Sequence, residues 1–198
     1  MTDGFVFWYR QAWRQGAPAS LFRSSERAGL GLANPVSGRV TAITNGPGSW
    51  GEQVPVTSQQ LAQIAESASD SEVDFQWWLD GETDVYVRIR RVHGDAAVIE
   101  FGLDGLGARQ ESVIGSITWV LQQTWSDCLG LVVDRSGATE DTDWDMVVLR
   151  GGPGIVRWPD TLAVPQAVAA RSAQLAVAAG QVVPPLVVHG QSLVPGRG

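Results

Sequence analysis

The stretch VDFQWWLDGETDVYVRIRRVHGDAAVIEFGL, residues 73–103, decides the fold class. Within it, apolar residues recur at every second position in three runs, 73–79, 85–90 and 97–103, and this is the period of half-buried strands. The turn sequences DGET and HGD separate the runs, so each strand is close enough to the next to form a hairpin. The stretch therefore predicts a three-stranded antiparallel meander.

A helix is predicted on each side of the meander. Before it, VTSQQLAQIAES (residues 56–67) offers Thr57 or Ser58 as the N-cap of a short helix. After it, residues 108–126 carry an apolar stripe at helical spacing, made of Val113, Ile114, Ile117, Val120, Leu121 and Thr124.

Two short apolar runs, CLGLVV (128–133) and MVVL (146–149), follow the second helix. Continuous apolar runs of this length are typical of strands that a helix covers, so both are predicted to be strands. A right-handed crossover through the helix would place the first of them parallel to the third strand of the meander. The result is an α+β fold: a two-layer sandwich with an α-β-β-β-α-β-β core and a mainly antiparallel sheet.

The flanking segments are predicted to extend this core. GFVFWYRQ (4–11) and GRVTAIT (38–44) have strand character, and VPQAVAARSAQLAVAAG (164–180) predicts an Ala-rich C-terminal helix. The Pro-containing run that follows it is expected to be an extended tail.

Charge divides the chain in the same way. Residues 1–50 carry a net charge of +3, residues 51–150 of −12 and residues 151–198 of +2. Only one of the ten prolines, Pro55, falls in the central hundred residues. We therefore expect three parts: an N-terminal extension with strands (1–54), an acidic core domain (55–150), and a C-terminal helix with a Pro/Gly-rich tail (151–198).

The composition limits the classes of partner that the protein is expected to bind and the compartment in which it is expected to be found. The formal net charge is −7 and all 14 basic residues are Arg, so no surplus of cations is present to displace the counterions of a nucleic acid. Cys128 is the single cysteine, which excludes an intrachain disulfide and favours a reducing compartment. No basic-then-apolar signal segment opens the sequence, and no run of about 18 apolar residues is present. A cytoplasmic protein without nucleic-acid or membrane partners is expected.

The stretch VVDRSGATEDTDWDMVVL (132–149) places five carboxylates between two apolar runs: Asp134, Glu140, Asp141, Asp143 and Asp145. Three interpretations are open. The segment is a hydrated hairpin connection, a surface that contacts a basic partner, or a Mg²⁺ or Ca²⁺ site with Asp134, Asp141, Asp143 and Asp145 as ligands. An EF-hand is excluded, because Met146 and Gly152 stand where that loop needs Gly and Glu.

The start of this stretch, DRSGAT, resembles the haloacid-dehalogenase phosphatase motif Asp-x-Asp-Gly-Thr. The resemblance implies that Asp134 is a nucleophile toward phosphate. The sequence departs from the motif at Ser136, which replaces the second Asp, and at Ala138, which precedes Thr139.

The outer face of the meander is expected to show Gln76, Trp78, Tyr86, Arg88, Arg90 and Glu100. Aromatic side chains beside arginines can stack on bases or sugars, or contact another protein. The same residues can instead pair across neighbouring strands.

In general character, FQWWLDGETDVYVRIRR (75–91) and GLVVDRSGATEDTDWD (130–145) resemble the small acidic immunity proteins encoded beside polymorphic toxins in actinobacteria. The resemblance implies a non-catalytic inhibitor that covers a partner enzyme with a carboxylate-rich surface. A basic partner, such as a toxin or nuclease domain, is then expected, with no catalytic residue and no cofactor. The expected contacts are Asp141, Asp143, Trp144 and Asp145, with Asp80, Glu82 and Asp84 as a second patch.

Two other functions stay open. One is a divalent-metal-dependent phosphoryl hydrolase that uses Asp134 and the 140–145 loop. The other is an adaptor or structural subunit of a homo-oligomeric or larger assembly.

Overall fold

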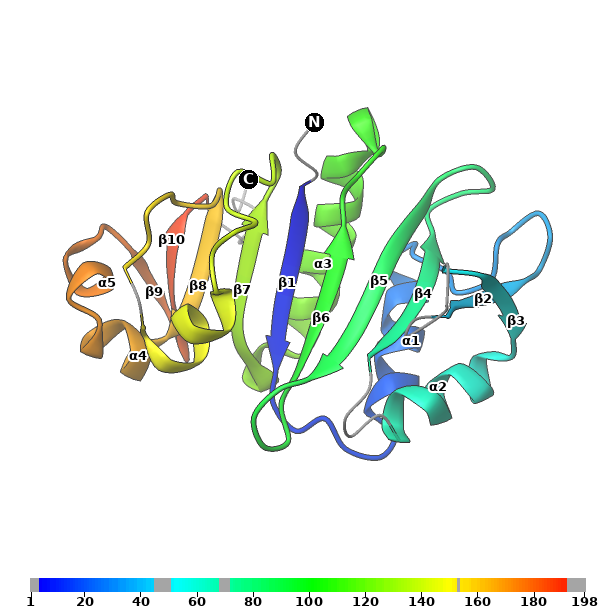
Figure 1. The fold of residues 1–198 in the computed structure, drawn as a ribbon, viewed down its shortest axis with the longest axis horizontal. Helices are drawn as coiled ribbons and strands as arrows, with labels where there is room; N and C mark the ends of the chain where they lie inside the picture. The colour runs from blue at the N-terminus through cyan, green and yellow to red at the C-terminus, as the bar shows by residue number, and fades with distance from the viewer. Residues whose placement is uncertain (1–3, 45–50, 68–71, 153, 192–198) are drawn as a thin grey trace.

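The computed structural model describes residues 4–44, 51–67, 72–152 and 154–191. Ten strands form one sheet in the order β3-β2-β4-β5-β6-β1-β7-β8-β10-β9 (Figure 1), and every neighbouring pair is antiparallel. The strands are β1 (Phe5–Arg10), β2 (Val40–Ile43), β3 (Gln53–Val56), β4 (Val73–Trp78), β5 (Asp84–Arg91), β6 (Ala97–Gly102), β7 (Cys128–Asp134), β8 (Thr161–Pro165), β9 (Gln181–Val183) and β10 (Leu186–Gly190). The helices are α1 (Ala17–Arg27), α2 (Ser58–Ser67), α3 (Gln110–Gln123), α4 (Gln166–Arg171) and α5 (Ala173–Val177). The predicted α+β class is confirmed, with a sheet that is antiparallel throughout.

The predicted meander is confirmed as β4, β5 and β6. Val73 pairs with Ile89, and Val87 pairs with Phe101, so the apolar members of the alternation share one face. Helices α1, α2 and α3 cover that face (Figure 1). Helix α2 begins with a capping box: the Gln60 amide donates to Thr57 Oγ1 at 3.1 Å, and the Thr57 amide donates to Gln60 Oε1 at 2.8 Å.

Strand β1 lies in the interior of the sheet, between β6 and β7. All six residues of FVFWYR are buried or half-buried, and the five apolar ones alternate between two apolar clusters on opposite faces of the sheet. Because β1 is antiparallel to both neighbours, β6 and β7 run parallel to each other, as the crossover through α3 predicts. They are one strand further apart than expected. Strands from all three predicted parts of the chain thus share one sheet.

The prediction of a second strand after α3, at MVVL, is wrong. Residues Met146–Arg150 form a π-helical turn, which ends at Gly151 with φ of 70°. Four apolar residues fit a strand or a buried helical turn equally well. The turn packs against the face of the sheet opposite α3, where Val147 and Val148 are buried.

The C-terminal part also differs from expectation. The Ala-rich helix is present as α4 and α5, which are separated at Ser172, and Ser172 caps α5 by accepting from the Leu175 amide. The expected tail after Gly180 is instead the hairpin β9–β10, which pairs with β8; residues 192–198 lie outside the described ranges. Helix α1 and strands β3 and β8 were not predicted, and the last two residues of β8, Val164 and Pro165, fall in the segment predicted as helix. No helix in the described ranges is long and apolar enough to cross a membrane.

Candidate functional site

The segment from Asp134 to Asp145, here called the acidic connection, joins β7 to the π-helical turn. It leaves the end of β7 and descends in front of the sheet, on the face opposite α3 (Figure 1, yellow-green to yellow). The structure divides its five carboxylates into two groups. One group is bonded inside the protein and the other is exposed.

Asp134 belongs to the inner group. Its Oδ1 accepts hydrogen bonds from the amide and hydroxyl of Ser136 at 3.0 Å, and its Oδ2 accepts from the amide and hydroxyl of Thr139 at 2.7 and 2.6 Å. Burial acts to raise the pKa of Asp134, but these hydrogen bonds outweigh burial and hold the pKa below its usual value. Both oxygens therefore fix the turn that begins the acidic connection.

Asp145 is bonded inside as well. Nη1 and Nη2 of Arg90 donate to its two oxygens at 2.6 and 2.8 Å, and the Tyr9 hydroxyl donates to Oδ1 at 2.8 Å. Burial acts to raise the pKa of Asp145, but the hydrogen bonds from Arg90 and Tyr9 outweigh burial and hold the pKa below its usual value. Burial and the neighbouring carboxylate raise the pKa of Tyr9, so the phenol stays protonated as the donor.

Trp144, expected as a partner contact, is a core residue. Its side chain is 2% exposed and packs in the cluster that holds Tyr9 and Val148. Its Nε1 donates to the carbonyl oxygen of Thr139 at 3.2 Å. An apolar ring at this position is stabilised by burial against the sheet, so Trp144 anchors the acidic connection and does not reach a partner.

The exposed group consists of Glu140, Asp141 and Asp143, here called the acidic ridge. No cation among the described residues forms an ion pair with any of the three. Asp143 Oδ1 accepts from the Met146 amide at 3.0 Å and so caps the π-helical turn. Glu140 is one of the five acids of the segment but was not among the expected contacts. Its place beside Asp141, in the most polar part of the segment, was the signal for it.

The second expected patch, Asp80, Glu82 and Asp84, lies at the β4–β5 hairpin, at the start of β5, whereas the acidic connection is bonded to Arg90 near the end of that strand. Six residues of a strand span about 20 Å, so the two patches are separate. Asp80 accepts from the amides of Glu82 and Thr83 and pairs with Arg109, and these bonds lower its pKa to about 2. Asp84 accepts from Gln76 Nε2 at 2.7 Å, and Glu82 is exposed.

The four candidate metal ligands are not brought together. Among the residues that the structure describes, no group of three or more His, Cys, Asp or Glu side chains is placed to hold a metal ion. Asp134 and Asp145 are bonded inside the protein, whereas Asp141 and Asp143 are exposed. The alternative metal site at Asp134, Asp141, Asp143 and Asp145 is therefore wrong for this geometry.

The arginines on the outer face of the meander are engaged in cross-strand pairs. Nε and Nη2 of Arg88 donate to Asp74 at 2.8 and 3.2 Å, and Arg90 pairs with Glu100 as well as with Asp145. The Tyr86 hydroxyl accepts from Arg88 at 3.0 Å. These contacts favour the cross-strand interpretation of this face over base or sugar stacking.

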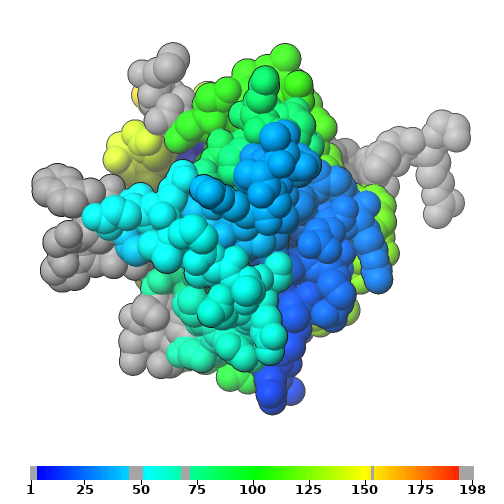
Figure 2. Space-filling model, turned by 90° about the vertical axis from the view of Figure 1, so that its right-hand side faces the viewer, coloured from blue at the N-terminus to red at the C-terminus, as the bar shows by residue number. Residues whose placement is uncertain are grey.

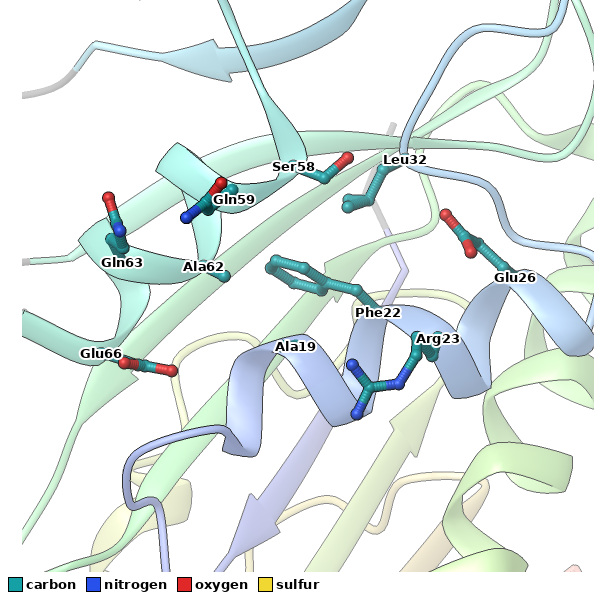
Figure 3. A pocket seen from close by; sticks show the side chains of 10 residues that line it. All are labelled: Ala19, Phe22, Arg23, Glu26, Leu32, Ser58, Gln59, Ala62, Gln63 and Glu66. Atoms are coloured by element: carbon teal, nitrogen blue, oxygen red, sulfur yellow. The ribbon is translucent and has the colours of Figure 1, made fainter.

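Two cavities flank the sheet. One, of about 340 Å³, lies beside Asp143 and is lined by side chains of the β5–β6 turn and the π-helical turn, including Val92, Met146 and Leu149. The other, of about 450 Å³, is a groove between α1 and α2 with Phe22 and Leu32 at its base (Figure 3). Figure 2 shows α1 in blue beside α2 in cyan at this end of the molecule. Side chains of both charge signs line each cavity, so neither selects a basic partner.

Cys128 is a packed thiol, as expected. It is 3% exposed, and burial raises its pKa to about 12. A thiol that stays protonated at neutral pH is a poor nucleophile.

No family model matches this sequence, and no curated protein matches it. Among solved structures, the chain is similar to a T6SS protein of Pseudomonas aeruginosa, with 12% sequence identity and a TM-score of 0.46. The likeness covers 94% of this chain and 64% of that chain, so this chain spans less than two thirds of that protein's length. A likeness with this identity and TM-score says nothing about function, so the function is inferred from the residues of the site.

Proposed function

We propose that this chain is a non-catalytic binding protein that presents the acidic ridge to a basic protein partner. The observation that carries the proposal is the sorting of the acids. Glu140, Asp141 and Asp143 are exposed and lack an ion pair among the described residues, while Asp134 and Asp145 hold the segment on either side of them.

Rigid support makes these exposed charges useful for binding. A loop already fixed in its bound conformation loses less conformational entropy when a partner docks. The bonds of Asp134 and Asp145 and the buried ring of Trp144 supply that support. Unpaired carboxylates also keep their whole charge for the partner, because no guanidinium of the described residues neutralises them.

The charge of the whole chain acts in the same direction. A net charge of −7 attracts a cationic protein over a distance and raises its association rate at low salt. A basic toxin or nuclease domain is the partner class that fits this surface and the resemblance to immunity proteins.

The absence of lysine makes a direct test possible. A carbodiimide joins carboxylates to amines, and the only amine in this chain is its N-terminus. In a complex captured from the protein's own cells, links from internal carboxylates to lysine must therefore reach another protein. Mass spectrometry of such links is expected to place Glu140, Asp141 or Asp143 at the junction.

A matched pair of variants measures the electrostatic contribution. Glu140→Gln/Asp141→Asn removes two charges from the ridge, and Glu26→Gln/Glu52→Gln removes two exposed charges on α1 and beside the edge strand β3. The ridge variant is expected to associate with the captured partner at least about tenfold more slowly at low salt and with a weaker salt dependence. Equal association rates for the two variants, or links that avoid the ridge, would refute the proposal.

A further inference from the structure

The outer surface of α3 has the composition of an interface. Its exposed positions are Glu111, Ser112, Gly115, Trp119, Gln122 and Gln123. No charged residue occurs from 112 to 123, and the one charge on the face, Glu111, is paired with Arg135 at 2.5 Å. Interface cores are depleted in charge and enriched in aromatic side chains, and Trp119 is 41% exposed here.

Gly115 is the second unusual feature of this face. It stands in the middle of a helix, where glycine is less stable than alanine. Its φ lies outside the left-handed region, and no heavy atom of the described chain lies within 4 Å of the position that a Cβ would take. Nothing in the described fold therefore needs a glycine at this position. Close approach of another molecule to the helix backbone would need one.

We propose that the outer face of α3 binds the same face of a second copy of this chain. Gly115 and Trp119 are four residues apart and so lie on one side of the helix. A two-fold axis level with Ile117 brings Trp119 of each copy opposite Gly115 of the other. This is the self-complementary pattern that an isologous contact requires.

Charge favours a second copy over a different partner at this face. Two copies each carry −7 and repel one another, so they meet at lowest electrostatic cost through a surface without unpaired charge. A basic partner is instead attracted to the acidic ridge. Figure 1 shows α3 behind the sheet and the acidic connection in front of it, so the dimer leaves the ridge of each copy open.

The area of the face sets the strength of the contact. A helix of 14 residues is about 21 Å long, and a strip about 10 Å wide covers roughly 200 Å² per copy. A standard stable interface buries about 800 Å² per partner. A contact of this size is weak, so the dimer is expected only at high protein concentration.

Sedimentation equilibrium of the whole chain, from about 10 µM to 1 mM, tests the dimer. Trp119→Ala is expected to weaken self-association at least about tenfold. The control is Trp158→Ala, because Trp158 is 42% exposed on a different segment, and this variant is expected to associate like wild type. Added salt is expected to strengthen the dimer by screening the repulsion, whereas it weakens binding of a basic partner at the ridge.

Gly115→Ala gives the sharper result. Alanine should raise the melting temperature by about 2–4 °C for a chain of this size, because it favours the helix. The same variant should self-associate more weakly, because the added methyl group keeps Trp119 of the other copy away. A monomer at every concentration overturns the proposal, as does a stabilised Gly115→Ala variant that associates like wild type. Neither result bears on the acidic ridge.

Discussion

Arg90 and Asp145 join strand β5 to the acidic connection through two parallel hydrogen bonds of 2.6 and 2.8 Å. The two residues are 55 positions apart in the sequence, and 22% and 33% of their side chains are exposed. Arg90 also pairs with Glu100 on β6. One guanidinium therefore holds two strands and the start of the π-helical turn together.

Removal of this guanidinium should destabilise the protein. Arg90→Met leaves Asp145 and Glu100 without their cation in a mostly buried place, so the free energy of unfolding should fall by about 2–3 kcal/mol. Urea denaturation at pH 7 measures it. Arg150→Met is the control, because Arg150 is exposed and has no ion-pair partner in the described part of the chain; its effect should stay within about 0.5 kcal/mol. Equal losses in the two variants would contradict this role for Arg90.

Asp134 should contribute to the loss of stability in acid. Its hydrogen bonds keep its folded pKa below the value of about 3.9 in an unfolded chain. A carboxyl with a lowered pKa contributes stability that is present above the unfolded pKa and is lost as the pH falls through the folded pKa. The free energy of unfolding should therefore fall between about pH 5 and pH 2. Asp134→Asn should be less stable at pH 7 and show a shallower fall over this range.

Four other carboxyls also affect stability in this pH range. Asp145, Asp80 and Glu111 have lowered pKa values and act in the same direction as Asp134, so a decline remains in Asp134→Asn. Burial raises the pKa of Glu100 despite its bonds to Arg90, so Glu100 favours the folded state as the pH falls and acts in the opposite direction. Asp141→Asn should keep the wild-type slope, and a slope equal to that of Asp134→Asn would show that the hydrogen bonds of Asp134 are not the cause.

The meander could be predicted because one of its faces is apolar and packs against helices, while most residues of the other face are polar, so that the two kinds of residue alternate along each strand. Strand β1 could not be placed, since both of its faces are buried and nothing local in FVFWYR says which strands flank it. The net charge of +3 and the prolines of the first fifty residues were taken as the mark of an extension, although this part of the chain supplies the interior strand β1. The prediction of a strand at MVVL was wrong for another reason: four consecutive apolar residues show neither the strand period nor the helix period.

The carboxylates of the candidate site were visible in the sequence, but their sorting was not. Asp145 is turned inward by Tyr9 and Arg90, which are 136 and 55 residues away. Asp134 is engaged by Ser136 and Thr139, which are local and could have been anticipated from the tendency of Asp to accept such bonds in turns. Trp144 is buried because the connection folds back over the sheet, which depends on the whole topology.

Close contact between the π-helical turn and the sheet should make Gly130 intolerant of a side chain. A Cβ at Gly130 would lie 2.4 Å from Val148 Cγ1 and 2.8 Å from the carbonyl oxygen of Ala163. Gly130→Ala should lower the free energy of unfolding by about 1–3 kcal/mol, because a core of this density cannot accept another methyl group. Gly130→Ala/Val148→Ala should lose less than the sum of the two single variants, because one clash is gone. Additive losses in denaturation would show that Val148 does not press on Gly130.

Millimolar Mg²⁺ or Ca²⁺ should leave the melting temperature unchanged, because the described part of the chain brings no three metal-binding side chains together. An ion present at 100 times its dissociation constant would add about 2.7 kcal/mol, which is several degrees for a chain of this size. Thermal unfolding of wild type and of Asp141→Asn/Asp143→Asn, each with the ion and with a chelator, separates the cases. A rise that disappears in the variant would make the acidic connection a metal site and favour the phosphoryl hydrolase. We expect no rise in either protein, and we expect the variant to be at least as stable as wild type. The reason is that the exposed carboxylates repel one another until a cationic partner neutralises them.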